Sequence, residues 1–539
     1  MRISKILPIL AIVYYLPVAL LPSSLIFGRE EKKLHLAVTS DMHSWYSNTL
    51  LYPKRTPAGL AHLAPIIRTE RKKYPDLILL DGGDLLQGSP LAYYYNLVHQ
   101  GPAKENPFFR LFVQLKYDAV TIGNHDFEIL NVIQNKYLPT SPIRWLGANV
   151  TEKGKNILLP YILLSRQGLR VAVLGLTTPA VPMWVNPSLI KNLTFQPIIP
   201  SAKKWIAHIQ KKERPDLIIG LIHSGDDPLR DDKNTKLRGV PAANTINQLL
   251  SAVPDFDLVL FGHNHRWPQF KSDLSVPYLK GTPIVSLGKK GERLIRLQMT
   301  LLKSEGEWKI HKLHGSILRP IAYKERQRNI LKTLPPSYLQ FLYENTPWKL
   351  EKQASKKELS ICINEIQARA LDEPNLDGTL LPLVRIKTKG IKRGDLLQRA
   401  HLFHWNAYDN KAISVMLSRR EIDLLSKPFH NRQDRKTIYN QLLYPWIKSE
   451  EIYSPLAYDY WWPKHEEWQR KFRFKISDYH YNGGGGVFSA LFYPRIQVAE
   501  EKKEAIREKL FRMLSDPEFL MPETCSFFRR IQIQTESPP

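Results

Sequence analysis

Short apolar runs alternate with amphipathic stretches along the first 300 residues or so of the chain. The runs are LHLAVTSD, DLILLDGGD, DAVTIGNHD, VAVLGLTTP, DLIIGLIHSG and DLVLFGHNH, and a polar cluster ends each one. Runs of this length, rich in leucine and β-branched residues, are typical of buried strands, and their alternation with helical segments is typical of α/β layers. The pattern predicts an α/β domain whose polar clusters lie at the C-terminal ends of the strands.

The later pattern predicts where this domain ends and a second one begins. The stretch PIVSLGKKGERLIRLQMTLL, near residue 300, predicts a pair of antiparallel strands, and a helical stretch broken by Pro335 and Pro336 follows it. Another helical pattern, KKELSICINEIQARALDE, opens the next domain. A chain of 539 residues is longer than one core usually organises. We therefore predict domains at 34–320 and 346–530, joined by a linker helix at 321–345.

The N-terminus predicts export. MRISK contains two basic residues, and the run from Ile6 to Gly28 contains no charged one. A short basic segment before an apolar run is typical of an export signal, which we place at 1–30. The run is also long enough to span a bilayer, and no clear cleavage triplet follows, so a cleaved signal peptide and a membrane anchor both stay open. Either one places the body outside the cytoplasm, in the periplasm or at the cell envelope.

Charge and cysteine content narrow the classes of partner. The formal net charge is +26, which attracts anions, but the basic residues are scattered and favour a solvated surface over a nucleic-acid groove. Nucleic acid is therefore not an expected partner, and the sequence predicts no oligomeric state.

Cys362 and Cys525 are the two cysteines, so at most one disulfide can form. Neither lies in a zinc-type cluster, and buried thiols are the favoured interpretation.

Residues that bind metals follow the predicted strands at several points. They are Asp41 and His43 in SDMH, Asp84 in GGD, Asn124, His125 and Asp126 in GNHD, His223 in IHSG, and His263 and His265 in GHNH. A single histidine after a strand is usually structural. Five successive strands of one parallel sheet, however, would bring all these groups to a single edge, where open α/β sheets bind their ligands.

The residue types indicate a pair of divalent ions. Carboxylate oxygens, imidazole nitrogens and an amide oxygen suit Zn²⁺, Mn²⁺, Co²⁺ or Fe²⁺. Two ions about 4 Å apart need a bridging anionic group, and together they can activate water and hold a phosphoryl oxygen. Two dications against two carboxylates leave the centre positive, which favours an anionic ester and its transition state.

These residues, in this order and spacing, closely resemble those of the calcineurin-like metallophosphoesterases, and specifically their exported two-domain nucleotidase branch. The resemblance covers essentially the whole chain after the export segment. It implies a four-layer α/β N-terminal domain, a β-sandwich flanked by helices, and a smaller C-terminal α/β domain that binds the substrate.

The resemblance also implies a role for each candidate residue. Asp41, His43 and His265 would bind one metal ion, Asn124, His223 and His263 would bind the other, and Asp84 would bridge them. His125 would stabilise the transition state or protonate the leaving oxygen, and Asp126 would orient it. The chain has GNHDFE where the branch commonly has GNHEFN, so the orienting carboxylate has a shorter reach.

The stretch YHYNGGGGVFSALF predicts a nucleotide contact in the second domain. Related nucleotidases stack the base between two aromatic rings, one of them three residues before an Asn-Gly-Gly turn. Tyr479 stands at that interval before Asn482, Gly483 and Gly484. Glycines allow a tight turn close to a flat ligand, and a stacked base contributes about 1–3 kcal/mol. A plain turn before a helix is the alternative interpretation.

Two further positions match the substrate-binding residues of the branch. Tyr408, in LFHWNAYDN, is the best match to the second ring, and Arg385, in LLPLVRIK, is the remaining cation where 5′-nucleotidases have NGGGIR. The missing glycines, together with LLQGSPL after Asp84, favour the subgroup that hydrolyses 2′,3′-cyclic nucleotides and 3′-nucleotides.

Other functions remain open at this point. The first alternative is a 5′-nucleotidase or nucleotide-sugar hydrolase with the same metal centre, and thiosulfate-ester hydrolysis is a more distant one. A third is a non-catalytic module of the envelope that binds nucleic acid or anionic lipid through its basic surface. The intact set of ligand residues argues against this third alternative.

Overall fold

The computed structural model describes the chain between residues 30 and 531, with gaps. The described ranges are 30–51, 56–99, 101–227, 235, 239–320, 329–371, 378–382, 391–405, 411–418, 443–449, 452–455, 471–477, 498–522 and 525–531. The predicted export segment therefore lies outside them, apart from its last residue. Within these ranges, no helix combines the length and the hydropathy that a bilayer span requires.

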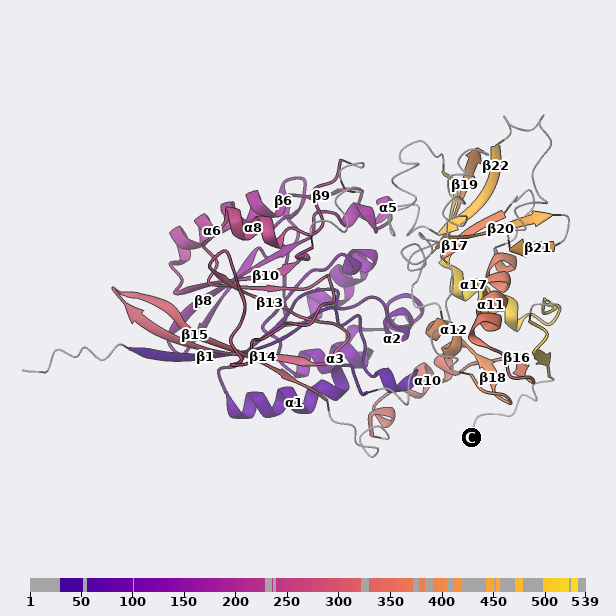
Figure 1. Ribbon diagram of the computed structural model, residues 1–539, viewed down its shortest axis with the longest axis horizontal. Coiled ribbons are helices and arrows are strands. Elements are labelled where there is room, and N and C mark those ends of the chain that lie inside the picture. Colours follow the sequence, from indigo (N-terminus) through magenta and orange to yellow (C-terminus); the bar gives the residue numbers. More distant parts are fainter. Residues whose placement is uncertain are drawn as a thin grey trace, which may run out of the picture.

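The first domain contains two six-stranded sheets (Figure 1). In the first sheet, four parallel strands are extended by two antiparallel strands beside β1. Its order is β15 (Glu307–Leu318), β14 (Leu294–Ser304), β1 (Glu31–Thr39), β2 (Ile78–Asp81), β3 (Ala119–Thr121) and β4 (Arg144–Leu146).

The second sheet has four parallel strands between two antiparallel edge strands. Its order is β12 (Tyr278–Leu279), β13 (Thr282–Ser286), β11 (Leu258–Phe261), β10 (Leu217–His223), β8 (Leu169–Thr177) and β7 (Tyr161–Arg166). Strands of both sheets contribute to one apolar core, which lies between them. Along β1, Leu36 and Val38 enter this core, whereas Ala37 faces the opposite side.

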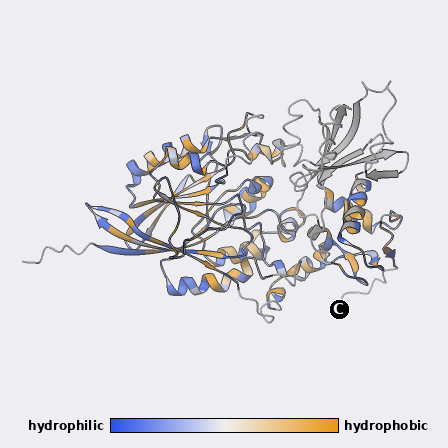
Figure 2. Cartoon of the chain, in the orientation of Figure 1, coloured by the Kyte–Doolittle hydropathy of each residue, from blue (hydrophilic) through white to orange (hydrophobic). Residues whose placement is uncertain are grey.

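Helices cover the outer faces of both sheets. The core outside the first sheet includes residues of α1 (Leu60–Lys73) and α3 (Pro107–Gln114). The core outside the second includes residues of α6 (Ile198–Glu213) and α8 (Ile246–Ala252). Figure 2 shows hydrophilic and hydrophobic residues alternating along α1 and α6, as amphipathic surface helices require. The predicted four-layer β-sandwich flanked by helices is confirmed.

Two expectations about the strands are wrong. The strands that precede the candidate ligands do not form one sheet, because β1, β2 and β3 belong to the first sheet and β10 and β11 to the second. The stretch PIVSLGKKGERLIRLQMTLL forms β13 and β14, which lie in different sheets, and β14 pairs instead with β1 and β15. Apolar periodicity identifies buried strands but does not determine their partners.

A helix of the predicted linker packs on the first domain. Residues 321–328 lie outside the described ranges, and α10 (Pro336–Leu342) follows them. Its Phe341 lies 6.3 Å from the ring of Tyr93 and 5.0 Å from the ring of Tyr94, measured between centroids. Phe403, in α12 (Arg399–Trp405), contacts Tyr93 at 5.8 Å. These aromatic contacts join the linker and the start of the second domain to the first domain.

The second domain has a separate core and is also α/β. A three-stranded sheet contains β18 (Leu396–Gln398), β16 (Asn345–Leu350) and β24 (Phe528–Arg530). A six-stranded sheet contains β21 (Ile452–Pro455), β20 (Leu443–Ser449), β17 (Gly378–Pro382), β22 (Lys471–Ser477), β19 (Lys411–Ser418) and β23 (Val498–Ala505). Helices α11 (Lys356–Ala370) and α17 (Ile506–Ser515) pack beside these strands. The limits given for the domains stay a prediction.

The two cysteines form a disulfide, which corrects the expectation of buried thiols. Cys362 lies in α11 and Cys525 precedes β24, 163 positions later in the chain. Their Cα atoms are 5.0 Å apart, within the range that a disulfide spans. Both residues are fully buried in the core of the second domain. This proximity arises from tertiary packing, which the spacing of two cysteines does not indicate.

Candidate metal centre

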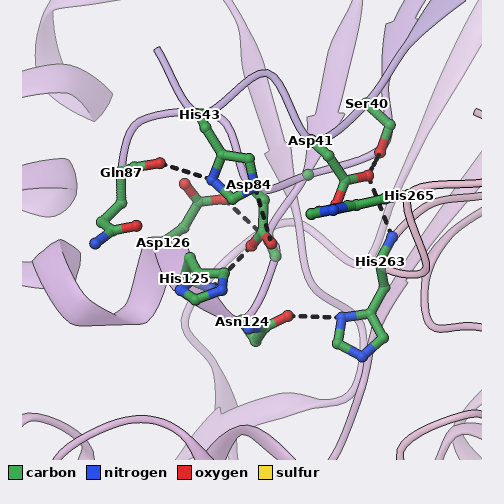
Figure 3. Close-up of polar contacts among 12 residues, drawn as sticks. Ser40, Asp41, His43, Asp84, Gln87, Asn124, His125, Asp126, His263 and His265 are labelled. Atoms are coloured by element: carbon green, nitrogen blue, oxygen red, sulfur yellow. Dashed lines mark hydrogen bonds and ion pairs between the residues drawn. The ribbon is translucent and has the colours of Figure 1, made fainter. Parts of the chain in front are cut away.

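The candidate ligands lie at the C-terminal ends of strands from both sheets. Asp41 and His43 follow β1, Asp84 follows β2, Asn124 follows β3, His223 ends β10, and His263 and His265 follow β11. The ends of β3 and β10 approach each other across the sandwich. The side chains therefore converge where the C-terminal edges of the two sheets meet (Figure 3).

Most of these residues have a backbone conformation that is unusual for residues other than glycine. The φ angles are positive at Asp41 (49°), His43 (48°), Asp84 (53°), His263 (80°) and His265 (59°). Left-handed conformations of non-glycine residues are uncommon and concentrate at functional sites. The repeated use of this conformation indicates that the fold turns these side chains toward one point.

One cluster of donor atoms consists of Asp41, His43 and His265, whose ligand atoms lie within 4.8 Å of one another. Oδ1 of Asp41 is buried, accepts no hydrogen bond from the described residues, and lies 3.1 Å from Nε2 of His265. Its other oxygen accepts a hydrogen bond from Ser40 Oγ at 2.5 Å. A buried carboxylate oxygen turned toward a ring nitrogen is suited to share a cation with it.

The second cluster surrounds His223. Its Nε2 lies 3.3 Å from Oδ2 of Asp84 and 3.2 Å from Oδ1 of Asn124. The same amide oxygen lies 2.8 Å from Nδ1 of His263. Oδ2 of Asp84 is also 3.9 Å from Nε2 of His43, so this carboxylate lies between the two clusters. Asp41 is close to both as well, because its ligand atom groups with those of Asp84 and His223.

Backbone carbonyls determine which ring nitrogen of His43 and of His223 faces the cluster. Nδ1 of His43 donates to the carbonyl of Gln87 at 2.8 Å, and Nδ1 of His223 donates to the carbonyl of Gly82 at 2.7 Å. A carbonyl only accepts hydrogen bonds, so the proton is on Nδ1 and Nε2 is the ligand atom. Burial lowers the pKa of His43 to about 3, which leaves its imidazole in the neutral form that binds metals.

The donor set fits two divalent metal ions. Two carboxylates, four imidazoles and one amide oxygen lie within reach of two adjacent points, and all but His263 and His265 are buried. This mixture of oxygen and nitrogen donors suits Zn²⁺, Mn²⁺, Co²⁺ or Fe²⁺. The residues predicted from the sequence as ligands are thus brought together by the fold.

His125 lies beside this centre and is held from two sides. Its backbone N–H donates to Oδ1 of Asp84 at 2.8 Å, and its ring lies 5.5 Å from that of His43. Its Nδ1 meets Oε1 of Glu128 at 2.6 Å. Burial alone would lower the pKa of His125, but the charges of Asp84 and Glu128 outweigh burial and raise this pKa to about 9. The carboxylates of Asp84 and Glu128 thus favour the protonated form of His125, which lies at the edge of the cluster.

The partner of His125 differs from the one predicted, because Asp126 turns away from it. The carboxylate of Asp126 accepts hydrogen bonds from the backbone N–H groups of Leu85, Leu86 and Gly123, each at 3.0 Å. It therefore joins the loops after β2 and β3 and does not orient the imidazole. Glu128 does so instead, because a 3₁₀ turn places residues i and i+3 on the same side. The spacing in HDFE is the signal that could have indicated this pair.

The predicted substrate contacts are not described by the structure. Tyr408, Tyr479, Arg385, Asn482, Gly483 and Gly484 all lie outside the described residues. Their roles stay predictions.

Comparison with known proteins finds similar chains. Residues 34–267 match the family model of the calcineurin-like phosphoesterases. The chain is 28% identical over 386 residues to the trifunctional nucleotide phosphoesterase protein YfkN of Bacillus subtilis, covering 66% of this chain and 25% of that protein. It is 28% identical over 319 residues to a 2′,3′-cyclic-nucleotide 2′-phosphodiesterase/3′-nucleotidase of Yersinia enterocolitica, covering 55% of this chain and 47% of the relative. The chain thus spans half or less of the length of these relatives.

A solved structure shows the same fold over most of the chain. A 5′-nucleotidase precursor from Thermus thermophilus superposes with a TM-score of 0.60 and 16% identity, covering 90% of this chain and 96% of that one. At this identity the likeness concerns the two-domain fold alone.

Proposed function

Because residues 34–267 form a calcineurin-like phosphoesterase domain, we propose that this chain is a two-metal phosphoesterase that hydrolyses nucleotides. Its proposed substrates are 2′,3′-cyclic nucleotides and the 3′-nucleotides that their opening yields. The observation that supports the proposal most strongly is the convergence of Asp41, Asp84, Asn124 and four histidines at the junction of the two sheets. Similarity to the 2′,3′-cyclic-nucleotide 2′-phosphodiesterase/3′-nucleotidase of Yersinia enterocolitica supports the choice of substrate.

Each described residue near the centre has a distinct part in this reaction. When bound, the two ions supply positive charge for the phosphoryl oxygens and acidify a water molecule. Asp84 lies between the two clusters, so its carboxylate fixes their separation. The hydrogen bond from Nδ1 of His125 to Glu128 leaves Nε2 free to donate a proton to an oxygen of the ester. Among the described residues, His125 is the one proposed as the proton donor.

A substrate panel tests the proposal. Rates with 2′,3′-cyclic AMP, 3′-AMP and 5′-AMP are measured with added Mn²⁺ or Co²⁺. We expect the first two to be hydrolysed faster than 5′-AMP. A strong preference for 5′-AMP would instead favour a 5′-nucleotidase or nucleotide-sugar hydrolase, which uses the same centre with the ribose reversed. Similarity to a 5′-nucleotidase of Vibrio cholerae supports this alternative.

Metal analysis separates the enzyme from a non-catalytic binding module. A phosphoesterase is expected to bind two transition-metal ions per chain and to hydrolyse bis(p-nitrophenyl) phosphate. A binding module would show neither property.

Export is a separate proposal, supported by residues 1–30 of the sequence alone. Fractionation of expressing cells should place the chain in the periplasm or with the envelope. A high-salt wash that fails to release it from membranes would support an uncleaved anchor. Recovery of the whole chain from the cytoplasm would contradict export.

A further inference from the structure

We propose that Gln87 is a positioning residue that links the orientation of His125 to that of the candidate ligand His43, acting through Glu128. The proposal rests on the function proposed above, because it assigns a role in the same reaction. The contacts of one residue support it: the backbone of Gln87 bonds the candidate ligand His43, and its side chain bonds Glu128, the partner of His125.

The backbone around Gln87 forms a cradle for His43. The carbonyl of Gln87 accepts the hydrogen bond from Nδ1 of His43 at 2.8 Å, as Figure 3 shows. Gly88 follows with a φ of +110°, and a Cβ at that position would lie 2.8 Å from the same ring nitrogen. Ser89 Oγ then donates to the carbonyl of Ser44 at 3.0 Å. Gln87 and Gly88 therefore lie against the imidazole of His43, and Ser89 holds the main chain of the next residue, Ser44.

The side chain of Gln87 reaches the other histidine indirectly. Its Nε2 donates to Oε2 of Glu128 at 2.8 Å, while Oε1 of Glu128 meets Nδ1 of His125 at 2.6 Å. Both oxygens of the carboxylate are thereby held, one by an amide and one by an imidazole. Gln87 is 6% exposed, whereas the Glu128 side chain is 27% exposed. Without the amide, one oxygen of this partly exposed carboxylate would lose the contact that fixes its rotation.

The main chain next to Gln87 is itself held firmly. The N–H groups of Leu85 and Leu86 donate to Asp126, and the carbonyl of Leu86 accepts a hydrogen bond from Asn96 Nδ2 at 2.7 Å. Because the main chain is held, the side chain of Gln87 can hold the carboxylate of Glu128 in one position. Partners of this kind, one step removed from a reacting group, typically change activity without touching the substrate.

A conservative variant tests this role. Gln87→Leu keeps the main-chain carbonyl that His43 bonds and keeps a side chain of similar size, but removes the amide donor. With bis(p-nitrophenyl) phosphate and Mn²⁺ we expect kcat to fall about 10- to 100-fold, with a nearly unchanged KM and an unchanged metal content. The matched control is Gln167→Leu. Gln167 also donates its amide N–H to a carboxylate, that of Asp76, but it does so at an exposed position distant in sequence from Gln87. The control should keep the wild-type kcat.

A double-mutant cycle shows whether Gln87 acts through Glu128. If it does, Gln87→Leu should cause no further loss of kcat once Glu128 has been replaced by alanine. Losses that simply multiply would overturn the proposal, as would a loss of bound metal in Gln87→Leu alone.

A crystal structure of Gln87→Leu gives a readout that needs no activity. We expect the Glu128 carboxylate to rotate and its contact with Nδ1 of His125 to be lost or lengthened. An unchanged Glu128 and His125 would overturn the proposal. An inactive wild-type protein with two bound ions would refute the proposed function, and the variant's crystal structure would still decide whether Gln87 holds Glu128 in place.

Discussion

A methyl group at Gly123, introduced by replacement with alanine, should displace Asp84 and so disrupt the candidate metal centre. The Cα of Gly123 faces Asp84 so closely that a Cβ would lie 2.7 Å from Cγ of Asp84, and still closer to its Oδ1 and its backbone nitrogen. Carbon atoms in contact prefer separations of about 3.5 Å or more. The carboxylate or its main chain would therefore have to move by roughly 1 Å, because backbone cannot yield as a flexible side chain does.

The size of the effect follows from the contacts of Asp84. Its Oδ2 lies 3.3 Å from Nε2 of His223 and 3.9 Å from Nε2 of His43, and its Oδ1 holds the backbone of His125 at 2.8 Å. A shift of about 1 Å in a catalytic group can reduce the rate about 100-fold. Overpacking itself costs about 1–3 kcal/mol of unfolding free energy, which a domain of this size should tolerate.

The assay compares Gly123→Ala with a matched variant. Neither Gly123 nor Gly147 has a left-handed φ, so alanine strains neither backbone. At Gly147 the nearest atoms to a new Cβ are methyl groups of Leu158 and Ile122, at 3.1 and 3.3 Å. We expect Gly123→Ala to remain folded, to bind fewer than two Mn²⁺ ions per chain after dialysis, and to lose about 100-fold in kcat on bis(p-nitrophenyl) phosphate. Wild-type metal content and kcat in Gly123→Ala would contradict the predicted role of Asp84 as the ligand between the two candidate metal sites.

Three further predictions concern other parts of the chain. Burial raises the pKa of Asp81 from 3.8 to about 7, so the fold is most stable at low pH, where Asp81 is protonated, and loses stability as pH rises toward 7. In thermal melts, the melting temperature of Asp81→Asn should therefore increase relative to that of the wild type between pH 4 and pH 8. A difference that stays constant over this range would contradict the prediction. Replacing both Cys362 and Cys525 by alanine should cost about 2–5 kcal/mol in urea unfolding and abolish any effect of reductant, whereas a wild-type protein whose stability does not change with reductant would argue against the disulfide. Tyr479→Ala should weaken nucleotide binding while hydrolysis of bis(p-nitrophenyl) phosphate stays near normal, and equal losses on both would mean that the ring supports the fold.

Much of the metal centre could be predicted from local sequence alone. Buried strands have a clear signature, and chemistry at their C-terminal ends follows from how α/β layers are built. For this reason Asp41, Asp84 and His223, far apart in the chain, were predicted to meet, and their side chains do converge. The number of sheets was not predictable in the same way, because strands of both sheets have equally apolar runs.

Features that depend on tertiary contacts were missed. The sequence predicts Asp126 as the partner of His125, whereas the structure shows Glu128. The turn after β3 directs the carboxylate of Asp126 toward main-chain donors and that of Glu128 toward the ring. The pairing of Cys362 with Cys525 likewise depends on how α11 packs against the end of the chain. In both cases the residue types were visible, but their directions were set by packing between segments.

Anomalous diffraction from crystals grown with Mn²⁺ tests the central claim most directly. We expect two manganese peaks on either side of Asp84, one near Asp41, His43 and His265 and the other near Asn124, His223 and His263. A single peak elsewhere, or none within bonding distance of these side chains, would contradict it.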